Sequence, residues 1–285
     1  MEYYISDNKI IIPKQKEFNP KDILTCGQVF RFENFDNCWT VNSGKEFAKI
    51  IEEGENYQII STNCEYFANY FDLNNNYEKI KTALRQDNVL KNVIKFGEGI
   101  RILKGDLLEI VFSFVISANN NISRIKKIIN ILCEKAGQDM GGYYAFPSLE
   151  ALSTLPFEFY SSLGAGYRDK YLFKLSRQLV GVDLDEKKRL NTTELRNWLI
   201  SLSGIGPKVA DCILLFGFGR TDVFPVDTWI EKVYNTCYYS GNKNRKQIAE
   251  FLVNRFGDLA GYAQQYLFYG ARSFNVLKSC SNKTD

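Results

Sequence analysis

The chain contains no histidine among its 285 residues. This absence excludes Ser-His-Asp and Cys-His nucleophile pairs, and it excludes every metal site that needs a histidine ligand. A general base must therefore be an aspartate, glutamate, lysine, tyrosine or cysteine. A nucleophile must act without an imidazole partner.

Other common features are also missing. The seven cysteines have no CxxC spacing, and the N-terminal stretch MEYYISDNKIIIPKQKEF lacks the basic-then-apolar order of a signal peptide. We therefore expect free thiols in a reducing compartment. No apolar run approaches the roughly 18 residues of a membrane span. The net charge of +3 permits a polyanionic partner but does not require one.

Two periodicities divide the chain. Residues 1–62 are rich in short aromatic and β-branched segments separated by turn residues, namely YYIS, KIII, VFRFENF, CWTV, EFAKII and YQIIS. From about Tyr77 the spacing becomes helical; in NISRIKKIINILCEK, one face carries Ile122, Ile125, Ile129, Leu132 and Cys133. Strands followed by helices predict an α+β protein. We expect an N-terminal antiparallel β domain over residues 1–75 and a helical domain over residues 76–285.

The most informative stretch is LSGIGPKVADCILLF, residues 202–216. The pattern predicts a helix with a Ser/Thr-type start in TTELRNWLISL, then a glycine-containing hairpin, then a second helix with Pro207 in its first turn. Gly204 and Gly206 allow close approach to the hairpin, and free N–H groups at a helix start can hold a phosphate. This arrangement suits a DNA backbone, although an ordinary connection between two helices has the same pattern.

Lys208 lies in the first turn of that second helix, where a cation opposes the helix dipole. This placement and partial burial predict a lowered amine pKa, and a neutral amine can form a Schiff base. Cys212 is one turn further on the same face, where it either packs in the core or exchanges charge with Lys208. Asp227 precedes the helical segment TWIEKVY and is well suited as its N-cap. Its carboxylate can also face a cationic intermediate.

Several segments together resemble one family. LSGIGPKVADCI and VFPVDTW resemble the helix-hairpin-helix, Gly/Pro-rich and aspartate motif of base-excision DNA glycosylases. CGQVFRF, VFSFVISANNNISRI, GAGYRDKYL and GYAQQYLF extend the likeness to the eukaryotic-type 8-oxoguanine DNA glycosylase/AP lyase, from about residue 22 to residue 270. The family's cluster-bearing relatives have four closely spaced C-terminal cysteines. Here only Cys237 and Cys280 lie late in the chain, so the resemblance implies no iron–sulfur cluster.

The resemblance also implies roles for individual residues. Lys208 would attack C1′ of the damaged nucleoside, displace the oxidised base and form a Schiff base, and β-elimination would nick the strand. Asp227 would stabilise the cationic sugar. The flipped base would lie in a pocket, with the Gly27 carbonyl accepting the N7–H that distinguishes 8-oxoguanine from guanine. The remaining base-pocket residues would be Cys212, Phe216, Gln264 and Phe268; without the resemblance, we would assign Phe268 to the core.

A second group would contact the DNA around the lesion. By resemblance, Asn119 fills the space left by the flipped base, Arg124 and Arg168 contact the unpaired cytosine, and Tyr167 is a wedge. Arginine donors suit the O2 and N3 acceptors of cytosine. The hairpin residues that would meet the DNA backbone are Gly204, Gly206 and Val209. The implied substrate is therefore duplex DNA with 8-oxoguanine, preferably opposite cytosine.

The sequence departs from the animal pattern at two positions. Trp229 stands where those proteins have a histidine, and Ala271 stands where they have the aspartate that pairs with it. By resemblance, these two side chains would make one phosphate contact and support the pocket, so these features are expected to differ in this chain while the chemistry stays the same. We expect a monomer without a metal or other cofactor in its chemistry, and a structural cation at the hairpin is left open. A bacterial or archaeal source would place it on nucleoid DNA in the cytoplasm, and a eukaryotic source in the nucleus.

Two other functions remain as alternatives. An alkylated-base DNA glycosylase can share this fold, but such enzymes usually work without the lysine, so Lys208 speaks against it. A non-catalytic DNA-binding module would use the hairpin alone. The joint presence of Lys208, Asp227, Gln264 and Phe268 is hard to explain in that way.

Overall fold

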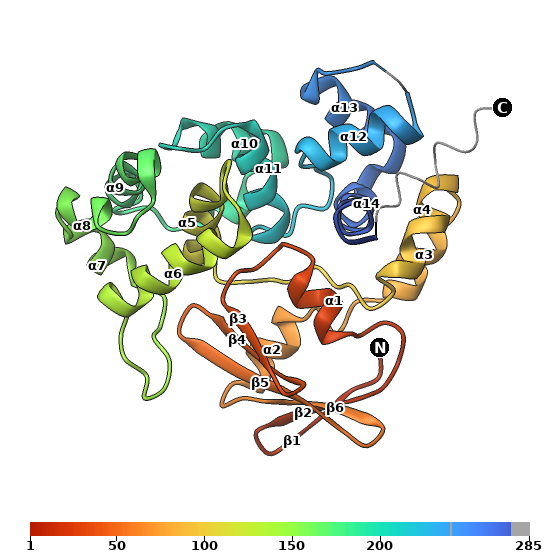
Figure 1. Cartoon of the computed structure of the whole chain (residues 1–285), viewed down its shortest axis with the longest axis horizontal. Helices are drawn as coiled ribbons and strands as arrows, with labels where there is room; N and C mark the ends of the chain where they lie inside the picture. Colours follow the sequence, from red (N-terminus) through yellow and green to blue (C-terminus); the bar gives the residue numbers. More distant parts are fainter. Residues whose placement is uncertain (240, 275–285) are drawn as a thin grey trace.

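The computed structural model describes residues 1–239 and 241–274, and Cys280 lies outside this part. The chain begins with a six-stranded antiparallel sheet in the order β1-β2-β6-β5-β4-β3 (Figure 1). The strands are β1 Tyr4–Ser6, β2 Lys9–Pro13, β3 Phe32–Phe35, β4 Cys38–Ser43, β5 Glu46–Glu53 and β6 Asn56–Ile60. The antiparallel β domain and the α+β class are confirmed.

One face of the sheet forms its own core. Ile10 and Ile12 of β2 are fully buried, while Lys9 at the start of the strand is exposed, as the two-residue period of a strand allows. Helices α1 Pro20–Thr25 and α2 Cys64–Tyr70 complete this core. The prediction of strands throughout residues 1–62 was therefore wrong at α1, whose Asn19 N-cap and Pro20 at the first position are helix-start signals. Likewise VFRFENF is a strand only from Phe32 onwards.

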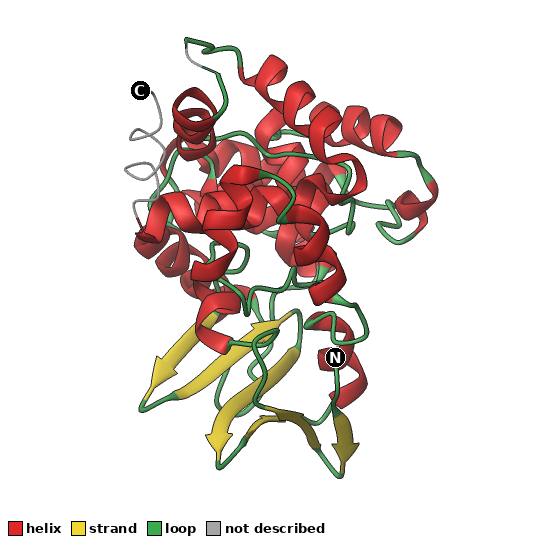
Figure 2. Ribbon diagram, turned by 90° about the vertical axis from the view of Figure 1, so that its right-hand side faces the viewer, coloured by secondary structure: helices red, strands yellow, loops and turns green. Residues whose placement is uncertain are grey.

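The remaining helices form two groups with separate cores (Figure 1). The first group contains α5 Leu107–Ser117, α6 Ile122–Ala136, α7 Leu149–Thr154, α8 Phe157–Ser161, η2 Gly166–Arg168, α9 Asp169–Gln178, η3 Glu186–Arg189, α10 Thr192–Ser201 and α11 Pro207–Phe216. The second contains α3 Tyr77–Leu84, α4 Asn88–Val93, η1 Ile94–Phe96, α12 Thr228–Cys237, α13 Arg245–Phe256, η4 Gly257–Leu259 and α14 Ala260–Phe274. Figure 2 shows the sheet at one end of the molecule and the helices at the other.

The details of helix α6 differ slightly from the expected face. Ile125, Ile129, Leu132 and Cys133 are buried, but Ile122 at the first position is exposed. Ile122 is the first residue of the helix, and the helical period alone does not show where packing against neighbouring elements begins. The predicted boundary at residue 75 remains a prediction, since α2 already follows the last strand and α3 packs with the C-terminal helices.

Two sets of buried polar contacts join the segment after α1 to later parts of the chain. Arg31 forms an ion pair with Glu109 of α5 at 3.0 Å, and the Gly44 backbone N–H donates to the same carboxylate at 2.8 Å. The fully buried Gln28 amide donates to the Arg101 carbonyl at 2.7 Å and accepts from Leu103 N–H at 2.8 Å. These bonds fix the loop that follows α1. They therefore position Gly27, which is the residue before Gln28.

The sequence also led us to expectations about the cysteines and about membrane-spanning segments. Cys26, Cys38, Cys64, Cys133 and Cys212 carry free thiols. Within the described residues, no helix combines the length and apolar character needed to cross a lipid bilayer.

Candidate active site

The predicted helix-hairpin-helix is present, formed by α10, a short turn and α11. Gly204 has a positive φ of 83°, and a Cβ there would lie 2.7 Å from Cβ of Tyr171, so this position requires glycine. Gly206 is the N-cap of α11 and has open space around it, and Pro207 follows at the first helical position. The N-cap of α10 is Asn191, in a capping box with Glu194, rather than the expected Ser or Thr.

The hairpin presents backbone rather than side-chain donors. The first N–H groups of α11 have no partner within the helix, and Gly206 has no side-chain cap. Val209 is buried, so a contact of this residue with a phosphate could use only its backbone N–H. The geometry is that of an anion site at a helix start.

A small cavity lies between α11 and α14. Its volume is about 40 Å³, close to the share of liquid volume of one water molecule. Its lining contains all the residues predicted to hold the base or perform the chemistry: Gly27, Lys208, Cys212, Phe216, Asp227, Gln264 and Phe268. The fold therefore brings together segments that are far apart in the sequence.

The amine of Lys208 lies among acidic and aromatic groups. Its Nζ is 5.8 Å from the centre of the Phe114 ring, which stacks on Phe216. Burial acts to lower the pKa of Lys208, but the Cys212 thiol and the Asp227 carboxylate outweigh it, and the pKa lies above its ordinary value. The predicted lowering was wrong, because the sequence did not reveal how many groups that can carry negative charge surround the amine. Burial also raises the pKa of the Cys212 thiol.

Asp227 is the N-cap of α12, as predicted. Its Oδ1 accepts from the backbone N–H groups of Trp229 and Ile230, each at 3.0 Å. These two bonds hold the carboxylate in one orientation at the edge of the cavity, next to Lys208. A fixed negative charge at this point can stabilise a developing positive charge nearby.

The opposite wall of the cavity is formed by α14 and Gly27. Gln264 is only 5% exposed, and its Oε1 has no hydrogen-bond partner. An acceptor buried in this way is costly unless a ligand supplies a donor. Gly27 has a positive φ of 90°, and a Cβ there would lie 2.9 Å from Nη1 of Arg272 and 3.0 Å from Cε1 of Phe268. The backbone of Gly27 can therefore approach the cavity closely only because it has no side chain.

The residues predicted to contact DNA around the lesion form a second group, between the α5–α6 loop and η2. Asn119 has a positive φ of 49°, and Tyr167 is 55% exposed. Arg124 donates to the Gly164 carbonyl at 2.9 Å. Arg168 is only 3% exposed and donates to the carbonyls of Asn119 at 2.7 Å and of Ala118. In this structure Arg168 therefore shapes the Asn119 loop, and contact with a base would require it to release carbonyls.

The two departures from the animal pattern lie in an apolar environment. Ala271 is buried in the core of the C-terminal helices, and Trp229 packs against this core. Lys232 lies 5.2 Å from the Trp229 ring. The next residue after Ala271, Arg272, lies 5.2 Å from the Phe268 ring and donates to the Thr25 carbonyl. Local support for the pocket in this chain thus comes from Arg272.

Sequence patterns alone missed some residues of the site. Phe114, Pro225 and Gln265 also line the cavity, and Gln265 donates to the Cys26 carbonyl at 2.8 Å. Gln265 directly follows Gln264, and Phe114 lies in the quoted segment VFSFVISANNNISRI, so adjacency was the available signal. An ion pair of 2.6 Å between the buried Asp211 and the partly exposed Arg196 was also missed, because nothing in the spacing indicates it. Within residues 1–239 and 241–274, no group of three or more Cys, Asp or Glu side chains could hold a metal ion.

Comparisons with known proteins identify the family of the chain. Residues 10–111 match the model of the 8-oxoguanine DNA glycosylase N-terminal domain, and residues 112–257 match that of the HhH-GPD superfamily base excision DNA repair proteins. The chain is 34% identical to a probable N-glycosylase/DNA lyase of Methanothermobacter thermautotrophicus over 73% of this chain and 74% of that protein. It is also 34% identical to the N-glycosylase/DNA lyase of Saccharomyces cerevisiae, covering 60% of this chain and 56% of that protein.

A solved structure is similar over nearly the whole chain. The 8-oxoguanine glycosylase/lyase of Clostridium acetobutylicum, in complex with double-stranded DNA containing cytosine opposite 8-oxoguanine, superposes with a TM-score of 0.90 and 38% identity. The match covers 96% of this chain and 99% of that one. The chain belongs to the HhH-GPD superfamily of base excision DNA repair proteins, and it carries the N-terminal domain of the 8-oxoguanine DNA glycosylases.

Proposed function

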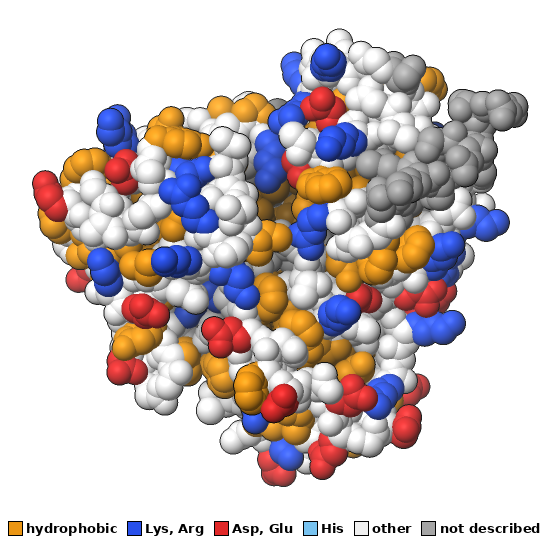
Figure 3. Space-filling model, in the orientation of Figure 1, with side chains coloured by type: hydrophobic (Ala, Val, Ile, Leu, Met, Phe, Trp, Pro, Cys, Tyr) orange, Lys and Arg blue, Asp and Glu red, His pale blue; other side chains and the backbone are white. Residues whose placement is uncertain are grey.

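We propose that this protein is a bifunctional DNA glycosylase/lyase that removes 8-oxoguanine from duplex DNA. The observation that carries the proposal is the single cavity that brings a lysine, a fixed carboxylate, a buried amide acceptor and a glycine backbone together. Its relatives named N-glycosylase/DNA lyase support the same activity. The face of the molecule shown in Figure 3 has a central hollow with Lys and Arg side chains around it, which suits a phosphate backbone.

The chemistry follows from Lys208 and Asp227. The neutral amine of Lys208 attacks C1′ of the deoxyribose, the bond from C1′ to the base breaks, and the base leaves with the bonding electrons. Opening of the sugar ring gives a Schiff base between Lys208 and C1′. Loss of a proton from C2′ then expels the 3′ phosphate and nicks the strand. Asp227 stabilises the positive charge on the sugar, because its two backbone hydrogen bonds hold the carboxylate in place.

Recognition of the lesion relies on the opposite wall. The Gly27 carbonyl accepts the N7–H of 8-oxoguanine, and the unpartnered Oε1 of Gln264 accepts from the base edge. Phe268 and Cys212 enclose the two faces of the ring. The cavity of about 40 Å³ is too small for a purine, so a wall must move when the base enters. Phe268 is half-buried, whereas Gln264 and Gln265 on the same helix are buried, and we assign the movement to it.

The second group of residues sets the preference for the opposite base. We assign contact with the unpaired cytosine to Arg124 and Arg168, filling of the vacated space to Asn119, and wedging to Tyr167. The exposure of Tyr167 and Arg124 supports these roles. To reach the base, the Arg168 guanidinium releases the backbone carbonyl of Asn119 and donates to the cytosine acceptors instead.

The proposal includes no redox or metal cofactor, because the reacting groups are an amine and a sugar. The proposal also includes a structural cation at the hairpin. This cation would bridge the hairpin carbonyls and a DNA phosphate, in addition to the contacts from backbone N–H groups. We propose that the protein acts as a monomer on DNA. It works where the DNA is, in the cytoplasmic nucleoid of a bacterium or archaeon or in the nucleus of a eukaryote.

The test uses duplexes with one 8-oxoguanine or one guanine opposite cytosine. Base release and strand nicking are measured separately for the wild type, for Lys208→Gln, and for the matched control Lys91→Gln, which changes an exposed lysine of α4. We expect the wild type and Lys91→Gln to release 8-oxoguanine but not guanine. Lys208→Gln should bind the damaged duplex and release neither base.

Two results would contradict the proposal. Release of an alkylated purine without release of 8-oxoguanine would favour the alkylated-base alternative. Binding without any base release by the wild type would favour a DNA-binding module.

A further inference from the structure

The reaction needs an acceptor for a proton. The pKa of Lys208 lies above its ordinary value, so the amine is protonated at neutral pH, and it must lose a proton before it can attack. An acceptor must be ionised, and burial, which raises the pKa of the Cys212 thiol, disfavours its ionised form. Asp227 is committed to two backbone N–H groups and to the positive sugar. The acceptor should therefore lie elsewhere.

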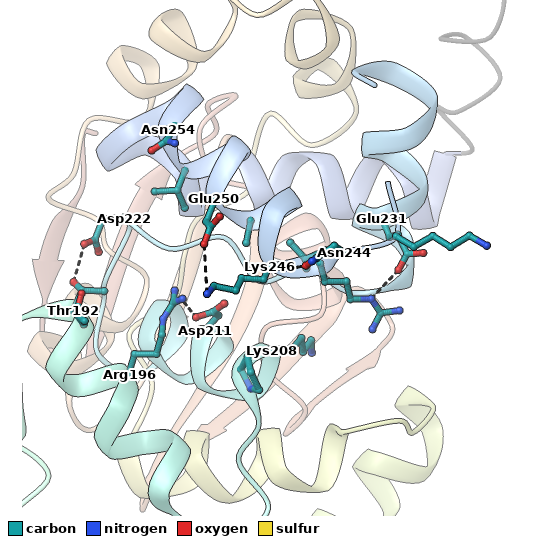
Figure 4. A pocket seen from close by; sticks show the side chains of 17 residues that line it. Thr192, Arg196, Lys208, Asp211, Asp222, Glu231, Asn244, Lys246, Glu250 and Asn254 are labelled. Atoms are coloured by element: carbon teal, nitrogen blue, oxygen red, sulfur yellow. Dashed lines mark hydrogen bonds and ion pairs between the residues drawn. The ribbon is translucent and has the colours of Figure 1, made fainter. Parts of the chain in front are cut away.

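Lys208 borders two cavities. One is the base cavity of about 40 Å³, and the other is a cavity of about 1050 Å³ among α10, α11, α12 and α13, hereafter the rear cavity (Figure 4). Among the described residues, Lys208 is the only one that lines both. The rear cavity is large enough to hold many water molecules. Lys208 therefore lies between the base cavity and the rear cavity.

Asp211 lies in the rear cavity next to Lys208. It is three residues later on α11, and residues at this spacing project from the same side of a helix. Figure 4 shows both side chains on the same helix, with Asp211 facing Arg196. Asp211 is only 5% exposed, and Arg196 Nη2 is 2.6 Å from its Oδ1.

We infer that Asp211 accepts the proton of the Lys208 ammonium through water in the rear cavity when damaged DNA is bound. The inference rests on the proposed function. In this step the N–H bond of Lys208 breaks, its electrons stay on nitrogen, and the proton forms an O–H bond with the Asp211 carboxylate. The step gives a neutral amine and a neutral carboxylic acid, and no other reactant is needed.

The environment makes Asp211 a suitable base. Burial raises the pKa of Asp211 to about 7, although Arg196 and Lys208 act against this rise. A carboxylate with this pKa is ionised above neutrality and accepts a proton more readily than an ordinary aspartate. DNA that covers Lys208 removes water from the amine, and burial lowers its pKa, so the two groups become better matched on binding.

Other charged groups around the rear cavity are mostly paired with each other. Glu231 pairs with Arg245 at 2.8 Å, Glu250 is 3.9 Å from Lys246, and the Thr192 hydroxyl donates to Asp222 at 2.7 Å. The charged side chains that line this cavity beyond Arg196, Lys208 and Asp211 are Asp222, Glu231, Lys243, Arg245, Lys246 and Glu250. Asp211, by contrast, lies on the same helix as Lys208, and the charge of each group affects the pKa of the other.

The test is the pH dependence of single-turnover excision, with enzyme in excess so that DNA affinity does not limit the rate. The wild-type rate should rise with pH up to about 7 and then level off, because Asp211 is ionised above that pH. Asp211→Asn should be about 100-fold slower at pH 7 and should have no plateau, its rate rising about tenfold per pH unit toward the pKa of the amine. Excision at pH above 9 should therefore recover in this variant.

Two further variants separate proton transfer from a structural role. Arg196→Gln removes a cation that lowers the pKa of Asp211, so its plateau should begin at least one pH unit higher than in the wild type. Glu250→Gln is the matched control, because it changes a carboxylate of the same cavity that pairs with Lys246 instead. Its profile should match the wild type.

A wild-type profile without a break near pH 7 would overturn the inference. So would an Asp211→Asn profile that is lowered equally at all pH values. If Asp211→Asn does not fold, as judged by thermal melting, an unshifted Arg196→Gln profile would overturn it. Failure of wild-type excision itself would overturn the proposed function, whereas normal excision with unshifted profiles would overturn the proton transfer alone.

Discussion

Substitution of Gly27 by alanine should separate the two activities of the enzyme. The new Cβ would lie 3.0 Å from Cε1 of Phe268 and 2.9 Å from Nη1 of Arg272, so both must retreat by a few tenths of an ångström. The backbone would also be held at a φ of 90°, which costs a residue with a side chain about 1–3 kcal/mol. A displaced wall misplaces the base, and a misplacement that reaches about 1 Å can reduce a rate about 100-fold.

The assay compares excision of 8-oxoguanine with cleavage of a duplex that already contains an abasic site. An abasic site has no base to enter the pocket, so Gly27→Ala should cleave it within about threefold of the wild-type rate while excision falls about 100-fold. The matched control is Gly54→Ala in the β5–β6 turn. Gly54 also has a positive φ, of 56°, but a Cβ at this position would have no neighbouring atom within 4 Å. This control should lose comparable stability and keep both activities.

The reasoning is refuted if Gly27→Ala excises 8-oxoguanine at the wild-type rate. It is also refuted if excision and abasic cleavage fall by the same factor, because the effect would then not act through the base. Thermal melting of both variants shows whether the loss of stability is matched.

Three further predictions concern stability and specificity. Arg31→Met leaves Glu109 buried without its cation and should lower the free energy of unfolding by about 3–5 kcal/mol in urea titrations; a loss below about 1 kcal/mol would contradict this. Burial raises the pKa of Asp211 from 3.8 to about 7, so the folded protein holds this proton more tightly than the unfolded chain. The resulting stabilisation is at most about 4 kcal/mol; it is complete below about pH 4 and is lost as the pH rises to about 7. Asp211→Asn should therefore gain stability relative to the wild type between pH 5 and pH 8, and an unchanged difference would refute it. The rate of 8-oxoguanine excision opposite cytosine should exceed the rate opposite adenine by at least about tenfold, and Arg124→Ala should reduce this ratio. Equal wild-type rates opposite the two bases would contradict the roles assigned to Arg124 and Arg168.

The sequence predicted the larger features well, because they depend on local patterns. The strand period, the Gly-Pro hairpin and the N-cap at Asp227 each need only a few neighbouring residues. Helix α1 was missed because its aromatic and β-branched surroundings hid the Asn19–Pro20 start signal. Motif likeness pointed to the members of the base cavity, which no periodicity could have brought together.

Electrostatic properties were harder to predict. The direction of the Lys208 pKa depends on side chains that approach from other segments, such as Asp227. The partner of Asp211 comes from the preceding helix, and its burial depends on the packing of the two helices. Such contacts are three-dimensional, and a single sequence does not reveal them.

The central claim is that Lys208 forms the covalent intermediate. The most direct measurement is borohydride trapping on a labelled duplex with one 8-oxoguanine opposite cytosine, for the wild type, Lys208→Gln and the control Lys91→Gln. The account predicts a covalent protein–DNA adduct with the wild type and with Lys91→Gln, and none with Lys208→Gln. An adduct with Lys208→Gln, or no adduct with a wild type that binds the duplex, would contradict it.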